Sequence, residues 1–410
     1  MRIVFATDWY SEGMGYSENI LPAVLARMGH DVFVVSSTMQ VYGNCDFYAD
    51  TYEQFLGPAI VEPGTKVING VTVIRLPIQV WWKRFKVAKA KTRTVLGLKP
   101  DIVYSWDPRS LQTLLLSMTA WTSKYKLFSS VHTLASVYPA YYRYKTMPLL
   151  QRLRLRLVDT LIGWLASQRI DVCYACAPDA AEIAIKFFGV RFDTVKYIVL
   201  GFDITHFHPV RTIEDHTDRN RIRASLQIAS DEIVCIYTGR FTVDKNPKCL
   251  ADAIGILRAS GHKYRAIFLG KGEQTADIAA VDGCKILPFV KHEKLPLYYR
   301  AIDIGVWPRE ESISMLDATA CGIPIVASDR MLARDRIDGN GLSYRENDPA
   351  DLASVLIQLG DSGLRKRLGT HGVEKVAAQF DIETVATEIV ADFQQVLDGL
   401  PVTNTGLTGA

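Results

Sequence analysis

The chain has 410 residues, of which 48% are hydrophobic and 22% charged, and its formal net charge at pH 7 is +3. This is the composition of an ordinary soluble globular protein, and the length favours two domains. A charge this near neutral, without a recognisable nucleic-acid module, excludes nucleic acid as an expected partner. The seven cysteines are scattered through apolar segments, which indicates reduced thiols in a cytosolic compartment.

The first half of the chain alternates between short apolar segments rich in β-formers and segments of helical length. Strands are predicted at residues 2–6, 31–36, 71–76, 101–105, 127–131 and 171–175. The segment SENILPAVLARMG has apolar residues at helical spacing and ends at Gly29, which predicts a helix with a glycine stop. Alternation of this kind predicts βαβ units and a parallel sheet.

The same pattern restarts in the second half. Strands are predicted at 233–238, 266–270, 302–307 and 323–328, and helices at 247–259, 314–321 and 350–360. We therefore predict an α/β fold of two tandem Rossmann-like, doubly wound domains with a ligand-binding cleft between them.

The domain boundary is predicted within residues 200–221, a polar segment without sustained periodicity. The expected units are two Rossmann-like domains, at residues 1–205 and 206–385. Residues 386–410 are expected to form a C-terminal helix that can return to the first domain, followed by a flexible tail.

Two glycines, Gly13 and Gly15, lie between the first predicted strand and the first predicted helix. Backbone amides at a helix N-terminus can approach a phosphate closely where glycines precede them. Glu18 stands where the third glycine of a G-x-G-x-x-G motif would be, so a simple tight turn explains the pair equally well.

The segment YTGRFTVDKNP places two cations, Arg240 and Lys245, just after a predicted buried strand. Two fixed cations at a strand end could neutralise a diphosphate and stabilise the charge that builds on it as it leaves. The alternative is a solvated loop in which Asn246 caps the helix that begins near Pro247. The two interpretations are equally good from these residues alone.

The segment VWPREESISMLDATACGIPIVAS favours the phosphate interpretation. Two acids follow its first strand, a Ser-Ile-Ser sequence then offers amides and hydroxyls at a helix start, and an aspartate about one turn later could accept hydrogen bonds from vicinal hydroxyls. The candidate residues are Glu310, Glu311, Ser312, Ile313, Ser314 and Asp317.

These motifs resemble the retaining glycosyltransferases of the GT-B fold in family 4, the glycosyl transferases group 1. That family typically shows G-R-x-x-x-x-K-N, a later G-x-G, and an E-x7-E region that ends E-A-x-A-x-G-x-P-V-V. This chain has GRFTVDKN, LGKGE and LDATACGIPIVAS in the same order. The resemblance is specific over residues 200–330 and loose in the first half, through GMG, LARMGHDV, PDIVYS and SSVHT.

The resemblance implies that residues 1–205 bind the acceptor and residues 206–385 bind the nucleotide sugar. It also implies a role for each matching residue. Arg240 and Lys245 would hold the donor diphosphate, and Asp317 would stand for the second acid, which binds the ribose. Glu310 or Glu311 would replace the first acid, near the transferred sugar. The matches to the family's G-x-G and to a histidine that it places at the sugar are Gly270, Gly272 and His132. The acidic loop is shorter than the family pattern, with six residues between Glu310 and Asp317.

No Asp-x-Asp triplet occurs in the chain. We therefore expect no catalytic metal, with side-chain cations serving the diphosphate instead. No cofactor is expected beyond the donor itself, a UDP- or GDP-type nucleotide sugar.

Two basic stretches lie in the first half, at residues 81–93 and 141–169. Basic amphipathic helices can lie on an anionic bilayer, where each cation near the surface contributes about 1 kcal/mol. The alternative is a solvated helix face that packs against the sheet. The first residues lack the features of a signal peptide, and no run of eighteen apolar residues occurs. We expect a cytoplasmic protein associated peripherally with the inner face of the membrane.

By its resemblance the chain is identified as a retaining, metal-independent glycosyltransferase of the hexosyltransferase type. It would transfer a sugar to a hydroxyl of a glycan or lipid-linked acceptor, in glycolipid or polysaccharide biosynthesis. A nucleotide-sugar epimerase of related fold and a non-catalytic glycan-binding relative are the alternatives.

Overall fold

The chain divides into two units in the computed structural model, which describes residues 1–78, 80–81, 85–86, 89–309 and 312–402. The first unit comprises Met1–Ala49, Leu56–Gly201 and Ile382–Ala410, and the second comprises Asp50–Phe55 and Phe202–Asp381. The last helix, α17 (Ile382–Leu397), thus belongs to the first unit. Residues 403–410, where the flexible tail is expected, lie outside the described residues, as do Glu310 and Glu311.

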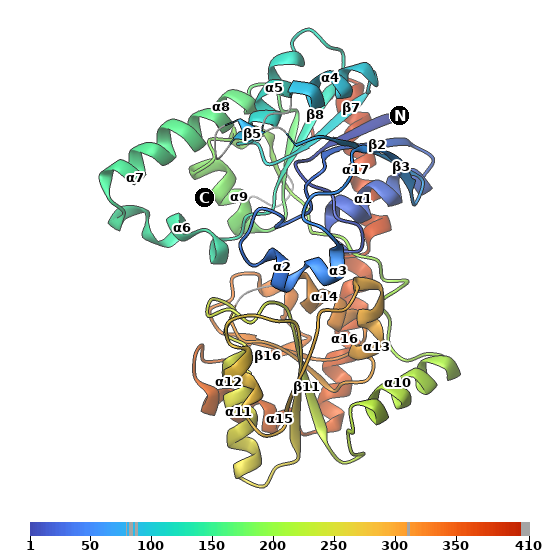
Figure 1. Cartoon of the computed structure of the whole chain (residues 1–410), viewed down its shortest axis with the longest axis vertical. Helices are drawn as coiled ribbons and strands as arrows, with labels where there is room; N and C mark the ends of the chain where they lie inside the picture. Colours follow the sequence, from blue (N-terminus) through green and yellow to red (C-terminus); the bar gives the residue numbers. More distant parts are fainter. Residues whose placement is uncertain (79, 82–84, 87–88, 310–311, 403–410) are drawn as a thin grey trace. The chain divides into compact units, whose positions relative to one another are not determined.

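The first unit is built on a twisted sheet whose described strands follow the order β10-β9-β8-β7-β1-β2-β4-β3 (Figure 1). All neighbouring strands pair in parallel except β3 with β4. The strands are β1 (Arg2–Ala6), β2 (Asp31–Ser37), β3 (Gly64–Ile68), β4 (Val71–Leu76), β7 (Ile102–Trp106), β8 (Lys126–Val131), β9 (Val172–Ala175) and β10 (Val195–Tyr197). A separate short hairpin pairs β5 (Val80–Trp81) with β6 (Phe85–Lys86).

Helices cover both faces of this sheet, because both faces of its central strands are apolar. In β1, Ile3 and Phe5 belong to one hydrophobic core and Val4 and Ala6 to the other. Helices α1 and α17 bury residues in the first core, and α4, α5, α8 and α9 in the second. The helices are α1 (Ser17–Arg27), α4 (Lys89–Gly97), α5 (Leu111–Thr119), α6 (Pro139–Arg143), α7 (Leu149–Arg154), α8 (Leu161–Ser167) and α9 (Pro178–Lys186), with α2 (Tyr48–Thr51) and α3 (Glu53–Leu56) in the loop after β2.

A buried polar cluster fastens α17 to the sheet of the first unit. The Lys196 ammonium on β10 lies 2.8 Å from the Asp392 carboxylate on α17, and the Tyr174 hydroxyl on β9 donates to the same carboxylate over 2.9 Å. Lys196 is 5% exposed and Asp392 4%. Burial alone would lower the pKa of Lys196, but the carboxylates of Asp392 and Glu388 outweigh it, so the pKa is raised and the lysine stays charged.

The second unit has a fully parallel sheet, and its described strands follow the order β13-β12-β11-β14-β15-β16. The strands are β11 (Ile233–Thr238), β12 (Tyr264–Leu269), β13 (Cys284–Leu287), β14 (Ile304–Trp307), β15 (Ile325–Ser328) and β16 (Gly341–Tyr344). The helices are α10 (Ile213–Ser225), α11 (Lys248–Ala259), α12 (Thr275–Ala279), α13 (Leu295–Tyr299), α14 (Ile313–Ala320), α15 (Pro349–Gln358) and α16 (Ser362–Gln379).

Each sheet has a switch point between two parallel strands, at which the chain turns to the other half of the sheet. It lies between β1 and β7 in the first unit and between β11 and β14 in the second. Ligands of doubly wound sheets bind beyond the carboxyl ends of the strands at such switch points. The candidate sites are therefore the loops that follow these four strands and their neighbours.

The prediction of two tandem parallel α/β sheets is confirmed, since every predicted strand is present within a few residues of its expected limits. The helix α10, which begins at Ile213 inside the segment 200–221, was not predicted. Its N-terminus is fixed by a capping box, in which Thr212 accepts from the Asp215 backbone N–H while the Asp215 carboxylate accepts from the Thr212 backbone N–H. The helix is mostly polar, which is why an apolar periodicity did not reveal it.

Candidate active site

The cationic loop of the second unit follows β11 at the switch point. Arg240 and Lys245 are both half-buried. The Tyr237 hydroxyl donates to the Arg240 carbonyl over 2.9 Å, which holds the start of the loop against the end of the strand. The Lys245 N–H donates to the Thr242 carbonyl over 3.1 Å. The alternative N-cap is wrong, because α11 has Pro247 at its N-cap position and no side-chain cap.

The loop after β12, which contains the predicted G-x-G, lies directly against the cationic loop. The Phe241 N–H donates to the Lys271 carbonyl over 3.1 Å. A Cβ on Gly270 would lie 1.9 Å from the Gly239 carbonyl oxygen, and one on Gly272 would lie 2.6 Å from that of Phe241. Both glycines are thus required for contact between two backbone segments, a reason that the sequence did not show.

The segment after β14 forms the third part of this edge. Ser312 is the N-cap of α14, and its hydroxyl accepts from the Ser314 N–H over 3.3 Å, while Ile313 is the first helical residue. The Ser312 hydroxyl and the Ser314 amide, two of the predicted phosphate-binding groups, therefore bind each other. Glu310 and Glu311 cannot be placed, because they lie outside the described residues.

Asp317 lies deep in the second unit. It is 1% exposed, and its Oδ2 lies 3.3 Å from the Nε2 of His292, while Oδ1 has no hydrogen-bond partner among the described residues. Burial alone would lower the pKa of His292, but the hydrogen bond and charge of Asp317 outweigh it, so the pKa is raised. The expected contact of Asp317 with a ribose stays a prediction, and its free oxygen is the atom available for it. His292 was missed from the sequence, where no motif marks it.

The first unit has a cavity of about 270 Å³ at the corresponding edge of its own sheet. Its walls come from the loops after β1 and β7, the end of β8 and the start of α1, which is where the switch point places a ligand. The lining residues are Thr7, Asp8, Trp9, Glu18, Trp106, Asp107, Ser110, Ser130, Val131, His132, Thr133 and Phe188.

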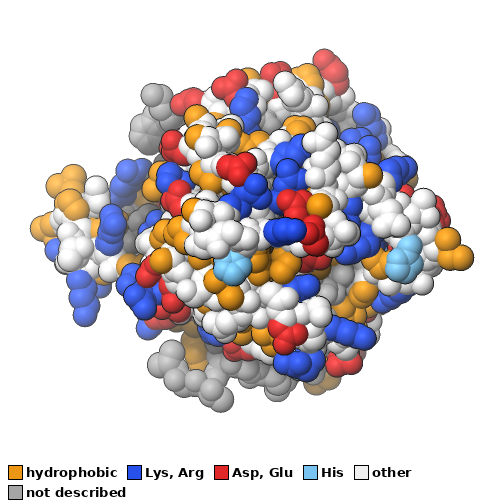
Figure 2. All heavy atoms as spheres, turned by 90° about the horizontal axis from the view of Figure 1, so that it is seen from below, with side chains coloured by type: hydrophobic (Ala, Val, Ile, Leu, Met, Phe, Trp, Pro, Cys, Tyr) orange, Lys and Arg blue, Asp and Glu red, His pale blue; other side chains and the backbone are white. Residues whose placement is uncertain are grey.

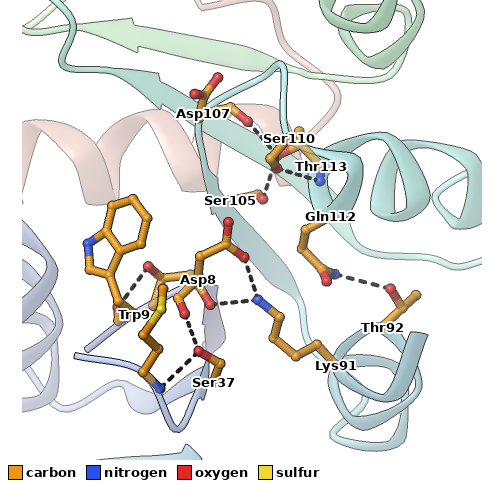
Figure 3. Close-up of polar contacts among 12 residues, drawn as sticks. Asp8, Trp9, Ser37, Lys91, Thr92, Ser105, Asp107, Ser110, Gln112 and Thr113 are labelled. Atoms are coloured by element: carbon orange, nitrogen blue, oxygen red, sulfur yellow. Dashed lines mark hydrogen bonds and ion pairs between the residues drawn. The ribbon is translucent and has the colours of Figure 1, made fainter. Parts of the chain in front are cut away.

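Two acids of the cavity are held by ion pairs with buried or half-buried cations, and Figure 3 shows the pair of Asp8 with Lys91. Lys91 on α4 donates to the Asp8 carboxylate over 2.7 Å and to the Thr7 carbonyl over 2.9 Å. Arg109 donates to Asp107 through Nε over 3.0 Å and through Nη2 over 2.7 Å. Lys91 is 5% exposed, so it does not belong to the cationic surface expected over 81–93. Residues 82–84 and 87–88 of that stretch lie outside the described residues.

His132 directly follows β8 and lines the cavity, while its contact with a sugar, which the resemblance implies, stays a prediction. Its Nδ1 lies 3.4 Å from the Ser17 hydroxyl at the start of α1. Burial lowers the pKa of His132 to about 4, although the charge of Asp107 acts in the opposite direction. The ring is therefore neutral near pH 7 and able to donate or accept a hydrogen bond.

Gly13 and Gly15 have φ values of +86° and +65°, which glycine adopts without strain. A Cβ on Gly13 would meet nothing within 4 Å. The tight-turn interpretation accounts for both glycines, and phosphate binding by this loop stays a prediction.

Several residues of the cavity were not singled out from the sequence, namely Asp8, Trp9, Trp106 and Asp107. Asp8 and Trp9 lie in the loop after β1, and Trp106 and Asp107 lie at the end of β7. These pairs indicate a site only once the strand order places β1 and β7 at the switch point.

Two Rossmann-like units with a polar site at each switch point define the GT-B class of glycosyltransferase. The model of the family described as "Glycosyltransferase Family 4" matches residues 22–206, and that of "Glycosyl transferases group 1" matches residues 232–362. The chain belongs to this family of glycosyltransferases.

Known relatives agree with this assignment. The chain is 27% identical over 72% of its length to a D-inositol 3-phosphate glycosyltransferase of Geodermatophilus obscurus, and 28% identical over 56% to one of Xylanimonas cellulosilytica. These alignments span 66% and 58% of the lengths of the two relatives. They leave the activity of the whole protein to be proposed.

Solved structures share the fold. A sucrose-phosphate synthase of Thermosynechococcus elongatus superposes with a TM-score of 0.73 at 18% identity, covering 97% of this chain and all of that one. Anabaena HepE in complex with UDP gives a TM-score of 0.69 at 17% identity, covering 96% of this chain and all of that one.

Proposed function

We propose that this protein transfers a sugar from a UDP- or GDP-type nucleotide-diphosphate donor to a hydroxyl of a glycan or lipid-linked acceptor. The observation that carries the proposal is the cationic loop of Arg240 and Lys245, held by the glycine loop at the switch point of the second sheet. A diphosphate at this edge would meet two side chains whose positive charges attract it. The UDP complex of HepE supports a nucleotide ligand for this fold.

The proposed reaction retains the anomeric configuration. The acceptor oxygen forms a bond to the anomeric carbon on the face from which the diphosphate leaves, and the bond from that carbon to the phosphate oxygen breaks. The departing phosphate takes the proton of the acceptor hydroxyl, so the products are the glycoside and the nucleoside diphosphate. Arg240 and Lys245 would stabilise the charge that grows on the diphosphate, and side-chain cations would take the place of a divalent ion.

Incubation with a panel of UDP- and GDP-sugars, with and without EDTA, tests this function. We expect a free nucleoside diphosphate from one donor, at a rate that EDTA does not change. An isomerised donor would show an epimerase instead, and an unchanged panel would show a non-catalytic relative. Loss of the rate with EDTA, restored by manganese or magnesium, would contradict the metal-independent mechanism.

The acceptor has two candidate chemistries. The names of the inositol phosphate glycosyltransferases among the relatives raise a phosphorylated polyol as one of them. An unphosphorylated sugar on a glycan or lipid is the other. The side chains that line the cavity of the first unit distinguish between the two.

We also propose that the first unit docks on an anionic lipid surface through a continuous helical segment, residues 149–167. In it a π-helical turn (Leu155–Thr160) joins α7 to α8, and the segment projects at the left of Figure 1. Its exposed apolar side chains are spaced along one helix face, with Leu150 at 82% exposure and Leu157 at 63%. The exposed apolar residues of the segment are Leu149, Leu150, Leu153, Leu157, Leu161, Trp164 and Leu165.

Cations accompany this face. Arg154 and Arg156 are exposed and have no acidic partner within 4.0 Å in the described part of the chain. Figure 2 shows blue Lys and Arg side chains along the projection at the left, with orange hydrophobic ones at its tip. An apolar face flanked by unpaired cations matches the boundary between anionic headgroups and acyl chains. No helix among the described residues is long and apolar enough to cross a bilayer.

Sedimentation with vesicles tests the docking. The parent protein should bind vesicles that contain phosphatidylglycerol, bind neutral vesicles weakly, and bind less at higher salt, because the screening length falls below about 8 Å above 0.15 M salt. Replacing Leu150 and Leu157 by Ser, or Arg154 and Arg156 by Glu, should each reduce binding. An equivalent pair away from the face, Lys366→Glu with Arg367→Glu, should not. Absence of binding by the parent to either kind of vesicle would refute the docking but not the transferase function.

A further inference from the structure

Acids and indoles line the cavity of the first unit. Asp8, Glu18 and Asp107 contribute carboxyl groups, Trp9 and Trp106 contribute indole rings, and no Lys or Arg is among the lining residues that the structure describes. Carboxylates accept hydrogen bonds from hydroxyl groups, and indole faces pack against the C–H face of a sugar ring.

One polar group in the cavity wall is left without a partner among the described residues. The indole N–H of Trp106 is buried and makes no hydrogen bond in the described part of the chain. An unpaired buried donor or hydroxyl costs free energy, which a hydroxyl-bearing ligand in the cavity would recover.

Two cations in the described part of the chain contact acids of the cavity wall, and both are already paired. Lys91 is paired with Asp8 and also donates to the Thr7 carbonyl, and Arg109 is paired with Asp107 through two nitrogens. The Arg109 guanidinium also stacks 3.6 Å from the centre of the Phe188 ring. A phosphate in the cavity would face carboxylates, and neither Lys91 nor Arg109 is free to balance its charge, which is unfavourable in a partly buried site.

We propose that this cavity binds the uncharged, hydroxyl-rich sugar or polyol ring of the acceptor and discriminates against a phosphorylated ring. The identification of this ring as the acceptor rests on the proposed transferase function. Of the two candidate acceptors, we therefore expect the unphosphorylated sugar and not the phosphorylated polyol.

Matched probe pairs, measured on the full chain by ligand-observed NMR titration, test the selectivity. The pairs are D-glucose with D-glucose 6-phosphate, and inositol with inositol 3-phosphate. In each pair the unphosphorylated member should bind at least tenfold more tightly. Equal or tighter binding of the phosphorylated members, or no binding of any probe, would overturn the proposal.

The variant Asp107→Asn is the sharpest test of the cause. Asp107 has a φ of +63°, a conformation that asparagine also tolerates, and an amide oxygen can still accept the Arg109 backbone N–H that now donates over 2.9 Å. The substitution removes the negative charge and releases the Arg109 guanidinium. The preference should therefore move by at least tenfold towards the phosphorylated probes.

Two further variants keep the test decisive. Asp193→Asn breaks a similar pair with Arg191 on the surface and should leave the selectivity unchanged. A shift as large as that of Asp107→Asn would overturn the proposal, because it would show an effect of net charge alone. If Asp107→Asn does not fold, Asp8→Asn, which releases Lys91 in the same way, should move the preference in the same direction, and an unchanged preference would count against the proposal.

The proposed function is assayed separately in the same preparations, by thermal stabilisation with UDP and GDP. A chain that binds the unphosphorylated sugars but neither nucleotide would refute the transferase and leave the selectivity of the cavity intact. A chain that binds a nucleotide and prefers phosphorylated sugars would refute the selectivity of the cavity and leave the transferase function intact.

Discussion

Replacing Arg240 or Lys245 by Ala should lower turnover at least tenfold while the protein remains folded. Both side chains are half-buried on a loop at the switch point, outside the hydrophobic core, so their loss removes charge from the site more than packing from the unit. Removing one group that stabilises charge in a transition state typically costs about 2.7–4 kcal/mol. Initial rates with the active donor, beside thermal unfolding of each variant, measure the effect.

Arg221→Ala is the matched control. Arg221 is in the same unit, and its side chain is 66% exposed and paired with Asp218 over 2.8 Å, so its loss should leave the rate unchanged. Turnover near the parent rate in Arg240→Ala or Lys245→Ala would remove the phosphate assignment of that residue. A loss of thermal stability equal to the loss of rate would assign it to structure instead.

The second large effect concerns stability. Asp392→Ala should destabilise the first unit by about 3–5 kcal/mol, because it leaves the buried Lys196 ammonium and Tyr174 hydroxyl without their shared carboxylate. The midpoint of thermal unfolding should fall by about 2–4 °C for each kcal/mol in a unit of this size. Chemical denaturation followed by far-UV circular dichroism gives the free energy directly.

Two variants separate the buried pair from a surface charge effect. Glu388 also contacts Lys196 over 2.8 Å, but its side chain is 49% exposed, so Glu388→Gln should cost less than about 1 kcal/mol. Replacing Lys196 by Met and Asp392 by Leu together should recover most of the stability, since an apolar pair leaves no buried charge. A loss in Asp392→Ala no larger than in Glu388→Gln would show that the cluster does not fasten α17.

The sequence predicted the sheets well because the central strands of a parallel sheet are apolar on both faces. The segments 2–6 and 233–238 appear as β1 and β11 with the limits that their apolar runs have. Edge strands were missed because they lack this pattern. β3 is exposed along most of its length and β13 is only half-buried, so neither gives a strong apolar signal.

The sequence located the cationic loop and the two glycines that hold it, because each belongs to a short motif with a fixed spacing. The sequence did not show which residues these glycines contact. Gly270 contacts the backbone of Gly239, thirty-one positions earlier in the chain, and only the pairing of β11 with β12 brings the two loops together.

The sequence by itself determined the fold class, the two-unit organisation and the loop of Arg240 and Lys245, since these depend on local periodicity and on short motifs. Only the tertiary structure decided the character of the cavity in the first unit. Asp8 and Asp107 are far apart in the chain, but they line the same cavity because β1 and β7 are neighbours in the sheet. Lys91 donates to Asp8 from a helix that the sequence had placed in a surface patch. The interaction energy of two charges depends on the distance between them, and the fold sets that distance for residues far apart in the chain. The sign of the net charge at a site therefore cannot be predicted from the local sequence.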